Sequence, residues 1–132
     1  MATALQFMLP GCPSVYYGDE AGMEGGKDPF NRRTYPWGRE DASLLAHFRA
    51  LGQLRKETAA VRLGDLEFLE AGDGHIAFKR TWENKIVKIY VNQNDTPWQV
   101  PGGKLLLGHN LRNVAPDWVS LEKLGWCIVE EM

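Results

Sequence analysis

Three short apolar segments joined by tight turns constrain the fold of this chain most strongly. The segments are DLEFLEA (65–71), HIAFKRTW (75–82) and KIVKIYVN (85–92), and the turns are GDG (72–74) and EN (83–84). In the third segment Val87, Ile89 and Val91 alternate with more polar residues, as in a strand with one buried face. A two-residue turn between such segments favours an antiparallel hairpin. We therefore expect an antiparallel sheet from about residue 65 onward.

Further strand-like segments follow this region at short intervals. They are WQV (98–100), KLLLGHN (104–110), WVSL (118–121) and GWCIVEE (125–131). Short strands at this spacing are typical of an antiparallel β-sandwich. The fold class expected for the chain is therefore mainly β.

The first 60 residues have a different pattern. TALQFML (3–9) is typical of a helix that ends at Pro10–Gly11, and PSVYY (13–17) lacks alternation, as in a strand buried on both faces of a parallel sheet. A long polar stretch follows, and then a helix that Asp41 or Ser43 could cap, with apolar residues on one stripe (Leu44, Leu45, Phe48, Leu51, Leu54). Strand, loop and helix form one β/α unit, so we divide the chain into residues 1–60 and 61–132.

Composition and charge exclude several functions. The formal net charge is −2, which argues against nucleic acid or an anionic membrane as a partner. No apolar run is long enough to span a bilayer, and the first residues lack the basic region of a signal peptide. Cys12 and Cys127 are isolated, and we interpret them as buried free thiols of a cytoplasmic protein. The three histidines are scattered and no phosphate-binding loop is present, so we expect no metal and no cofactor.

The polar stretch carries a specific resemblance. LPGCPSVYYGDEAGMEGGKDPFNRRTYPW (9–37) resembles the eighth-strand region of the α-amylase superfamily of glycoside hydrolases, family 13. All elements of the family pattern occur in order: P-G-x-P-x-x-Y-Y-G-D-E, a glycine-rich stretch, D-P-x-x-R and P-W. MEGGKDPFNR (23–32) is most similar to the neopullulanase, cyclomaltodextrinase and maltogenic-amylase branch. The resemblance implies that residues 1–60 are the end of a TIM barrel and that residues 61–132 are the C-terminal sandwich, in which DGHIAFKR (73–80) is the most family-like phrase.

The resemblance also implies roles for individual residues. Asp28 and Arg32 match the pair that binds glucose rings, and the other interpretation of this pair is a salt bridge that braces the loop. Asp19, Glu20 and Tyr17 would support the loop. The family's catalytic carboxylates lie on earlier strands, and a barrel needs about 250 residues, so we expect no catalytic residue in this chain.

Three functions remain open at this point. The chain could be the C-terminal portion of an α-glucan hydrolase that is inactive alone, a module that binds α-glucan without cleaving it, or a packing element that contacts the missing barrel or a second copy of itself. A small β-domain unrelated to amylases is a fourth, less favoured alternative. We also expect Trp37 to pack against the following helix and the other tryptophans to be buried, although two exposed tryptophans could form a starch-binding surface. Residues 1–40 could be disordered, or could pack unusually, without the other barrel strands.

Overall fold

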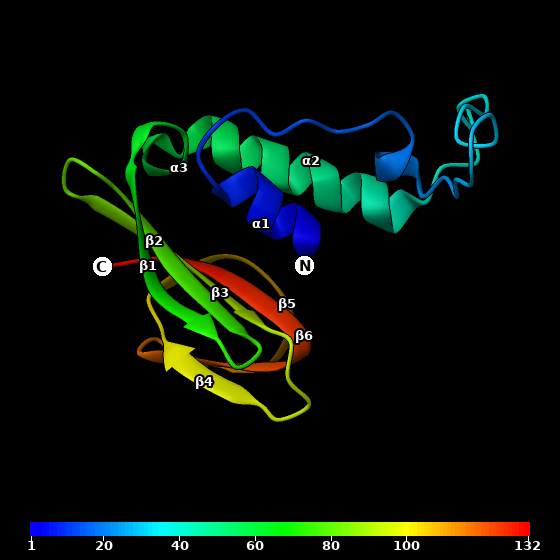
Figure 1. Cartoon of the computed structure of the whole chain (residues 1–132). Helices are drawn as coiled ribbons and strands as arrows, with labels where there is room; N and C mark the ends of the chain where they lie inside the picture. Colours follow the sequence, from blue (N-terminus) through cyan, green and yellow to red (C-terminus); the bar gives the residue numbers. More distant parts are fainter.

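A layer of helices packs on one face of a bent antiparallel sheet (Figure 1). A computed structural model describes residues 1–132. The helical elements are α1 (Ala2–Met8), the 3-10 turn η1 (Asp19–Ala21), α2 (Ala42–Glu57) and α3 (Ala59–Leu63). The strands are β1 (Asp65–Gly72), β2 (His75–Trp82), β3 (Lys85–Asn92), β4 (Trp98–Pro101), β5 (Lys104–Val114) and β6 (Trp118–Glu130).

The first three strands form the meander predicted from the sequence. β1 pairs with β2 and β2 with β3, all antiparallel, and the β2–β3 register places Trp82 opposite Lys85 across the two-residue turn. Glu83 in this turn has a φ of 53°, as a tight hairpin requires. The predicted boundaries of β2 and β3 agree with the structure, because period-2 alternation and short turns are strong local signals.

The last strand, β6, organises the rest of the sheet. One of its edges pairs with β4 along its first half and with β3 along its second half, while the other edge pairs with β5. The prediction that WVSL and GWCIVEE are separate strands was therefore wrong. The chain bends between them at Leu124, which has a φ of 57°, and a Cβ on Gly125 would lie 2.7 Å from the Asn110 carbonyl oxygen. β5 pairs with β6 on both sides of the bend, so β6 is one strand with an irregularity in the middle. In the sequence, the residues at this irregularity look like a turn.

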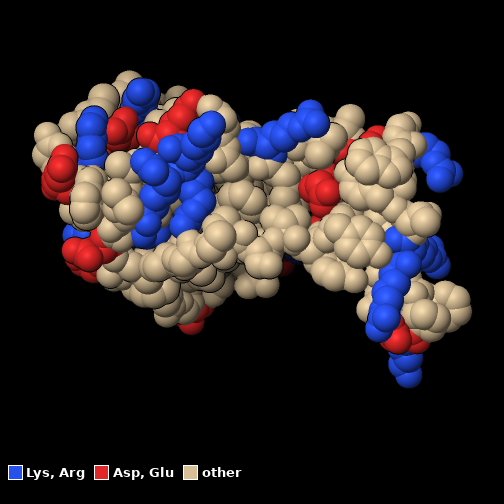
Figure 2. Space-filling model, turned by 90° about the horizontal axis from the view of Figure 1, so that it is seen from above, with Lys and Arg blue, Asp and Glu red and all other residues tan.

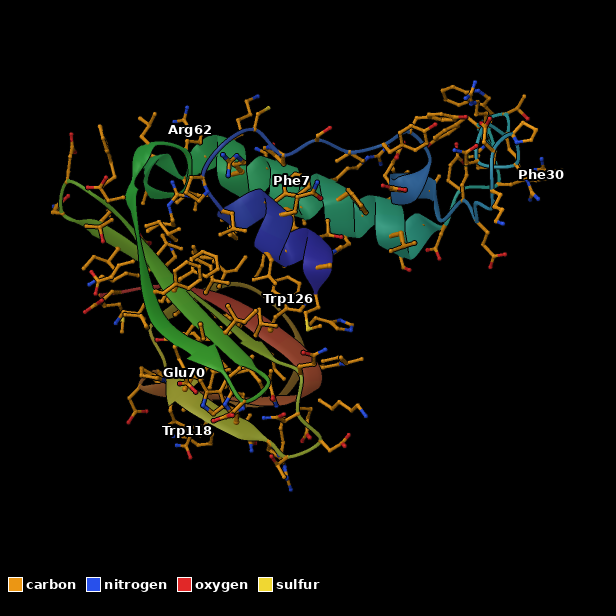
Figure 3. The ribbon with its side chains drawn as sticks, viewed as in Figure 1. Phe7, Phe30, Arg62, Glu70, Trp118 and Trp126 are labelled. Atoms are coloured by element: carbon orange, nitrogen blue, oxygen red, sulfur yellow. The ribbon has the colours of Figure 1, made fainter.

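Two apolar clusters lie on opposite faces of the sheet. The first joins the helices to the sheet and includes Phe7, Leu51, Phe78, Ile89 and Trp126. Figure 3 shows Trp126 below α1, and the Phe7 ring packs against Phe48 of α2. The second is enclosed on the other face by β4 and the first half of β6, and its members are Ala77, Tyr90, Val100, Val119, Leu121, Cys127 and Val129. The predicted mainly β, antiparallel sandwich architecture is confirmed.

The N-terminal region agrees with the sequence in its helices but not in its strand. The Asp41 carboxylate caps α2 by accepting from the Ser43 and Leu44 amides at 2.9 and 3.0 Å. Residues 13–17 form no strand, so the prediction of a strand buried on both faces was wrong: Val15, Tyr16 and Tyr17 are exposed. A strand requires a neighbour to complete its backbone hydrogen bonds, and the sheet of this chain lies on the far side of α1 and α2 (Figure 1). The barrel fragment remains a prediction.

Individual side chains correct other expectations. Cys127 is buried, and burial raises its pKa to about 12, whereas Cys12 is exposed because it lies on the unpaired segment. Trp37 is 81% exposed and packs on Tyr35, not on α2. Of the tryptophans in the sheet, Trp126 is buried and Trp82 is exposed at 38%. No helix is both long enough and apolar enough to cross a membrane.

Candidate functional site

The candidate site is the polar loop, which we define as residues 18–41. It runs from η1 to the start of α2 and its tip extends away from the rest of the chain, with Phe30 at the far end (Figures 1 and 3). Its base is fixed, because the Asp41 amide donates to the Ala21 carbonyl oxygen at 3.0 Å. The other backbone hydrogen bonds within the loop close short turns. The Phe30 amide donates to the Lys27 carbonyl oxygen at 2.8 Å, and the Arg32 amide donates to the Pro29 carbonyl oxygen at 3.0 Å. The loop is therefore an anchored projection.

Asp28 and Arg32 lie together at the tip of the loop. The Arg32 Nε lies 2.7 Å from Asp28 Oδ1, and the side chains are 69% and 59% exposed. An ion pair this exposed contributes only about 0–1 kcal/mol to folding. The contact of the ion pair is made through the Nε of Arg32, and the side chain is largely exposed, so the terminal amino groups of the guanidinium can donate to another partner. Both interpretations of this pair, a loop brace and a sugar-binding pair, are compatible with this geometry.

The supporting residues take different positions. The Tyr17 hydroxyl donates to the Arg33 carbonyl oxygen at 2.9 Å, which ties the segment before the loop to its far arm. Glu20 accepts from the Gly18 amide at 3.0 Å and stabilises η1. Asp19 is exposed and, with Tyr17, lines a small cavity of about 110 Å³ that also includes Tyr16, Met23, Glu24, Gly25, Phe30 and Asn31. The structure thus brings Tyr17 and Asp19 together and separates the role of Glu20 from theirs.

Exposed aromatic rings flank these polar groups. Tyr16 and Tyr17 have ring centroids 4.9 Å apart, and Tyr35 and Trp37 have centroids 4.6 Å apart. Removal from solvent raises the pKa of Tyr35, and the nearby charges of Glu20 and Glu40 raise this pKa further. Flat rings beside hydroxyl-binding groups suit the alternately apolar and polar faces of a sugar.

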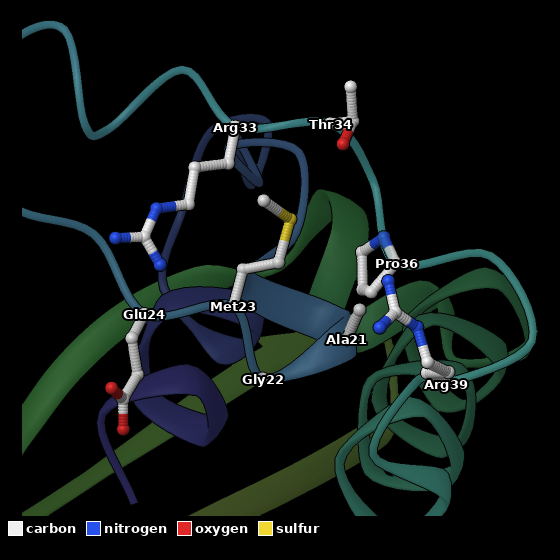
Figure 4. Close-up of a pocket in the computed structure, with 8 residues that line it drawn as sticks. All are labelled: Ala21, Gly22, Met23, Glu24, Arg33, Thr34, Pro36 and Arg39. Carbon is white, nitrogen blue, oxygen red and sulfur yellow. The ribbon is translucent and has the colours of Figure 1, made fainter.

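A larger open cavity lies between the two arms of the loop. Its volume is about 620 Å³, and its lining includes Met23, Glu24, Arg33, Thr34 and Arg39 (Figure 4). Figure 4 shows Arg33 and Arg39 on opposite sides of Met23 and Pro36. In Figure 2, basic and acidic side chains are interspersed at the loop end of the molecule. Such a surface offers hydrogen-bond donors and acceptors to a neutral polar ligand.

Sequence reasoning missed two arginines that hold the end of α1, before the segment that leads to the polar loop. Arg55 on α2 and Arg80 on β2 donate to backbone carbonyl oxygens at the end of α1. Arg80 is 1% exposed, and burial, followed by the charge of Arg55, lowers its pKa. A signal was present: Ile76, Phe78 and Arg80 alternate along one strand, which places Arg80 on the face that packs against the helices.

Comparison with known proteins identifies the relatives of this chain. An amylopullulanase from Thermoanaerobacter thermohydrosulfuricus is 42% identical over 106 residues, which cover 72% of this chain. The intracellular maltogenic amylase of Bacillus subtilis (strain 168) is 31% identical over 122 residues, which cover 89% of it.

The chain belongs to the α-amylase family of glycoside hydrolases. The structure of a debranching enzyme from Nostoc punctiforme superposes on 96% of this chain, with a TM-score of 0.81 and 28% sequence identity. No protein-family model matches the chain. It spans only 7% of the amylopullulanase, 21% of the maltogenic amylase and 27% of the debranching-enzyme chain. The family recognised from the polar loop is confirmed, and the chain corresponds to a small part of these relatives.

Proposed function

We propose that this chain is the C-terminal portion of an α-glucan-acting glycoside hydrolase and that its polar loop forms part of the rim of the substrate cleft. The projection of the polar loop, with Asp28, Arg32 and exposed aromatic rings at its surface, carries this proposal. The short share of each relative that the chain spans supports it.

Asp28 and Arg32 act together as a binding pair in this proposal. The carboxylate holds the guanidinium by one Nε contact, and the free amino groups donate to vicinal hydroxyls of a glucose ring. The weak contribution of such an exposed pair to folding favours this role over a bracing role. Tyr17 holds the far arm of the polar loop and Glu20 holds the start of η1, while Asp19 lines the same small cavity as Tyr17.

The chain alone is not a hydrolase in this proposal. Asp19 and Glu20 are adjacent in sequence, and Glu20 is engaged by the Gly18 amide. A retaining mechanism needs two carboxyl groups about 5–5.5 Å apart on either side of one glycosidic bond. The nucleophile and the acid then come from the remainder of the enzyme.

The exposed segment 13–17 and the apolar side chains of the polar loop form the surface that the remainder of the enzyme covers. Val15, Tyr16, Tyr17, Phe30 and Trp37 are all exposed in the chain by itself. Of these, Tyr16, Tyr17 and Phe30 line one cavity, and exposed apolar side chains gathered in this way are typical of an interface. A second copy of the chain is the alternative occupant. We also propose a cytoplasmic location, which similarity to an intracellular maltogenic amylase supports.

A chimera tests the proposal. The aligned 122 residues of the Bacillus subtilis maltogenic amylase are replaced by this chain, and hydrolysis of maltooligosaccharides is measured. We expect the chimera to be active, and we expect Arg32→Gln to raise KM about tenfold because charged hydrogen bonds to the sugar are lost. The control Arg62→Gln removes the same charge at an exposed position on α3 (Figure 3) and should leave KM unchanged. An inactive chimera, or equal KM values in the two variants, contradicts the proposed role.

Titration of the isolated chain with maltoheptaose distinguishes the proposed cleft rim from the alternative, a module that binds glucan without the rest of the enzyme. Saturable binding that is lost in Arg32→Gln supports that module. Absence of binding to the isolated chain, together with an active chimera, supports a rim that functions only with the rest of the enzyme.

A further inference from the structure

The carboxyl end of α1 is held by side chains from two other elements. The last carbonyl groups of a helix have no partner within the helix. Here the Phe7 and Leu9 carbonyl oxygens accept from Arg55 of α2, the latter at 3.2 Å, and the Met8 carbonyl oxygen accepts from Arg80 of β2 at 2.8 Å. Three consecutive carbonyl groups are therefore satisfied by two guanidinium groups.

Arg80 also reaches the end of a second helix. Its Nη2 and Nε donate to the Gly64 carbonyl oxygen at 2.7 and 3.2 Å, and Gly64 is the residue that ends α3. The approach requires glycine, because a Cβ there would lie 2.7 Å from the Thr81 carbonyl oxygen. Arg80 thus joins α1, α3 and β2 at one buried point, where the partial negative charges of two helix ends favour a cation.

Arg55 also contacts the chain beyond the end of α1. Its Nη2 donates to the Gly11 carbonyl oxygen, on the segment that leads to the polar loop. Between residues 10 and 17 the only backbone carbonyl that accepts a backbone amide is that of Tyr16. The path of this segment therefore depends on side-chain donors, namely Arg55 at Gly11 and Gln6 at Ser14.

We infer that Arg55 of α2 and Arg80 of β2 form a clamp that positions the end of α1 and the segment leading to the polar loop. Arg80 fixes Met8 at the end of α1 on β2, and Arg55 fixes Phe7, Leu9 and Gly11 on α2. The sheet and α2 together then support the segment that leads to the polar loop, whatever ligand the loop binds. The inference rests on these contacts and not on the proposed glucan-binding function.

Hydrogen exchange of the purified chain, followed by mass spectrometry, tests the clamp. The variants are Arg55→Gln and Arg80→Lys, and Arg62→Gln on the exposed side of α3 is the charge-matched control for the first. We expect amides in residues 2–11 to exchange about tenfold faster in both clamp variants, because local opening of α1 becomes easier. The β2–β3 hairpin should keep its original protection, and the control should match the original chain throughout.

A conservative variant distinguishes a positional effect from general damage. In Arg55→Lys a single ammonium group replaces the fork of the guanidinium, so it can reach only some of the three carbonyl groups. Exchange of residues 2–11 should then lie between that of the original chain and that of Arg55→Gln. Unchanged exchange in Arg55→Gln, or an equal increase in residues 2–11 and in the β2–β3 hairpin, would overturn the inference.

Discussion

Replacement of Leu51 by alanine tests whether the helices and the sheet share one core. Leu51 lies on α2, is fully buried, and belongs to the same apolar cluster as Phe78 and Trp126 of the sheet. The substitution removes three carbon atoms, worth about 2.4 kcal/mol at about 0.8 kcal/mol each. A residual cavity adds about 1 kcal/mol. The expected loss in the free energy of unfolding is therefore about 3–4 kcal/mol.

Urea unfolding followed by two signals measures this loss. Circular dichroism reports largely on the helices and tryptophan fluorescence on the sheet, and the two transitions should coincide and shift together. The matched control is Leu63→Ala, which makes the same chemical change at a side chain that is 55% exposed and should cost no more than about 0.5 kcal/mol. A loss below about 1 kcal/mol for Leu51→Ala, or helix and sheet transitions at different urea concentrations, would refute the shared core.

Three further predictions follow from other buried contacts. Asn92→Ala should cost about 2–3 kcal/mol in urea unfolding, because its fully buried amide donates to three backbone carbonyl groups that would lose their partner; an unchanged midpoint would count against this. Gly64→Ala should cost about 1–3 kcal/mol, because the new Cβ meets the Ala60 and Thr81 carbonyl oxygens, the latter at 2.7 Å; equal stability would show that the backbone around Gly64 adjusts freely. The pKa of His47 in the folded chain lies below its ordinary value of 6.5, mainly because the ring is partly buried and also because the N-terminal amino group and His109 are nearby. The unfolded chain therefore binds this proton more tightly than the folded chain. The melting temperature should fall as pH falls below about 6.5, and His47→Gln should reduce that slope; equal slopes would contradict this assignment.

The sheet could be predicted from the sequence because its signals are local. Alternation in KIVKIYVN and the turn at Glu83–Asn84 define β3 and the β2–β3 hairpin without reference to the rest of the chain. The bend in β6 could not be predicted in this way. Leu124 and Gly125 resemble a turn, and only pairing with β5 across the bend keeps the strand continuous.

The N-terminal region could not be predicted from local signals alone. PSVYY has strand composition, but a strand forms only where another strand completes its hydrogen bonds, and this chain provides no such neighbour. The exposure of Tyr16 and Tyr17 has the same origin, since a strand at this position would need a neighbouring strand. Trp37 differs, because the helix expected to cover it is present and the ring packs on Tyr35 instead. For the candidate site, the resemblance of D-P-x-x-R to the family motif identified Asp28 and Arg32 as a pair, and the structure places their side chains in contact. Arg80 was missed because an arginine on an otherwise apolar strand face is assigned to solvent by default.

Hydrolysis by the isolated chain is the most direct test of the central claim. Purified protein is incubated with maltooligosaccharides, cyclodextrin and pullulan, and released reducing ends are counted over time. We expect no release above the buffer control, because the proposed function assigns the reacting carboxyl groups to the remainder of the enzyme. Sustained turnover that scales with the concentration of this chain would contradict it.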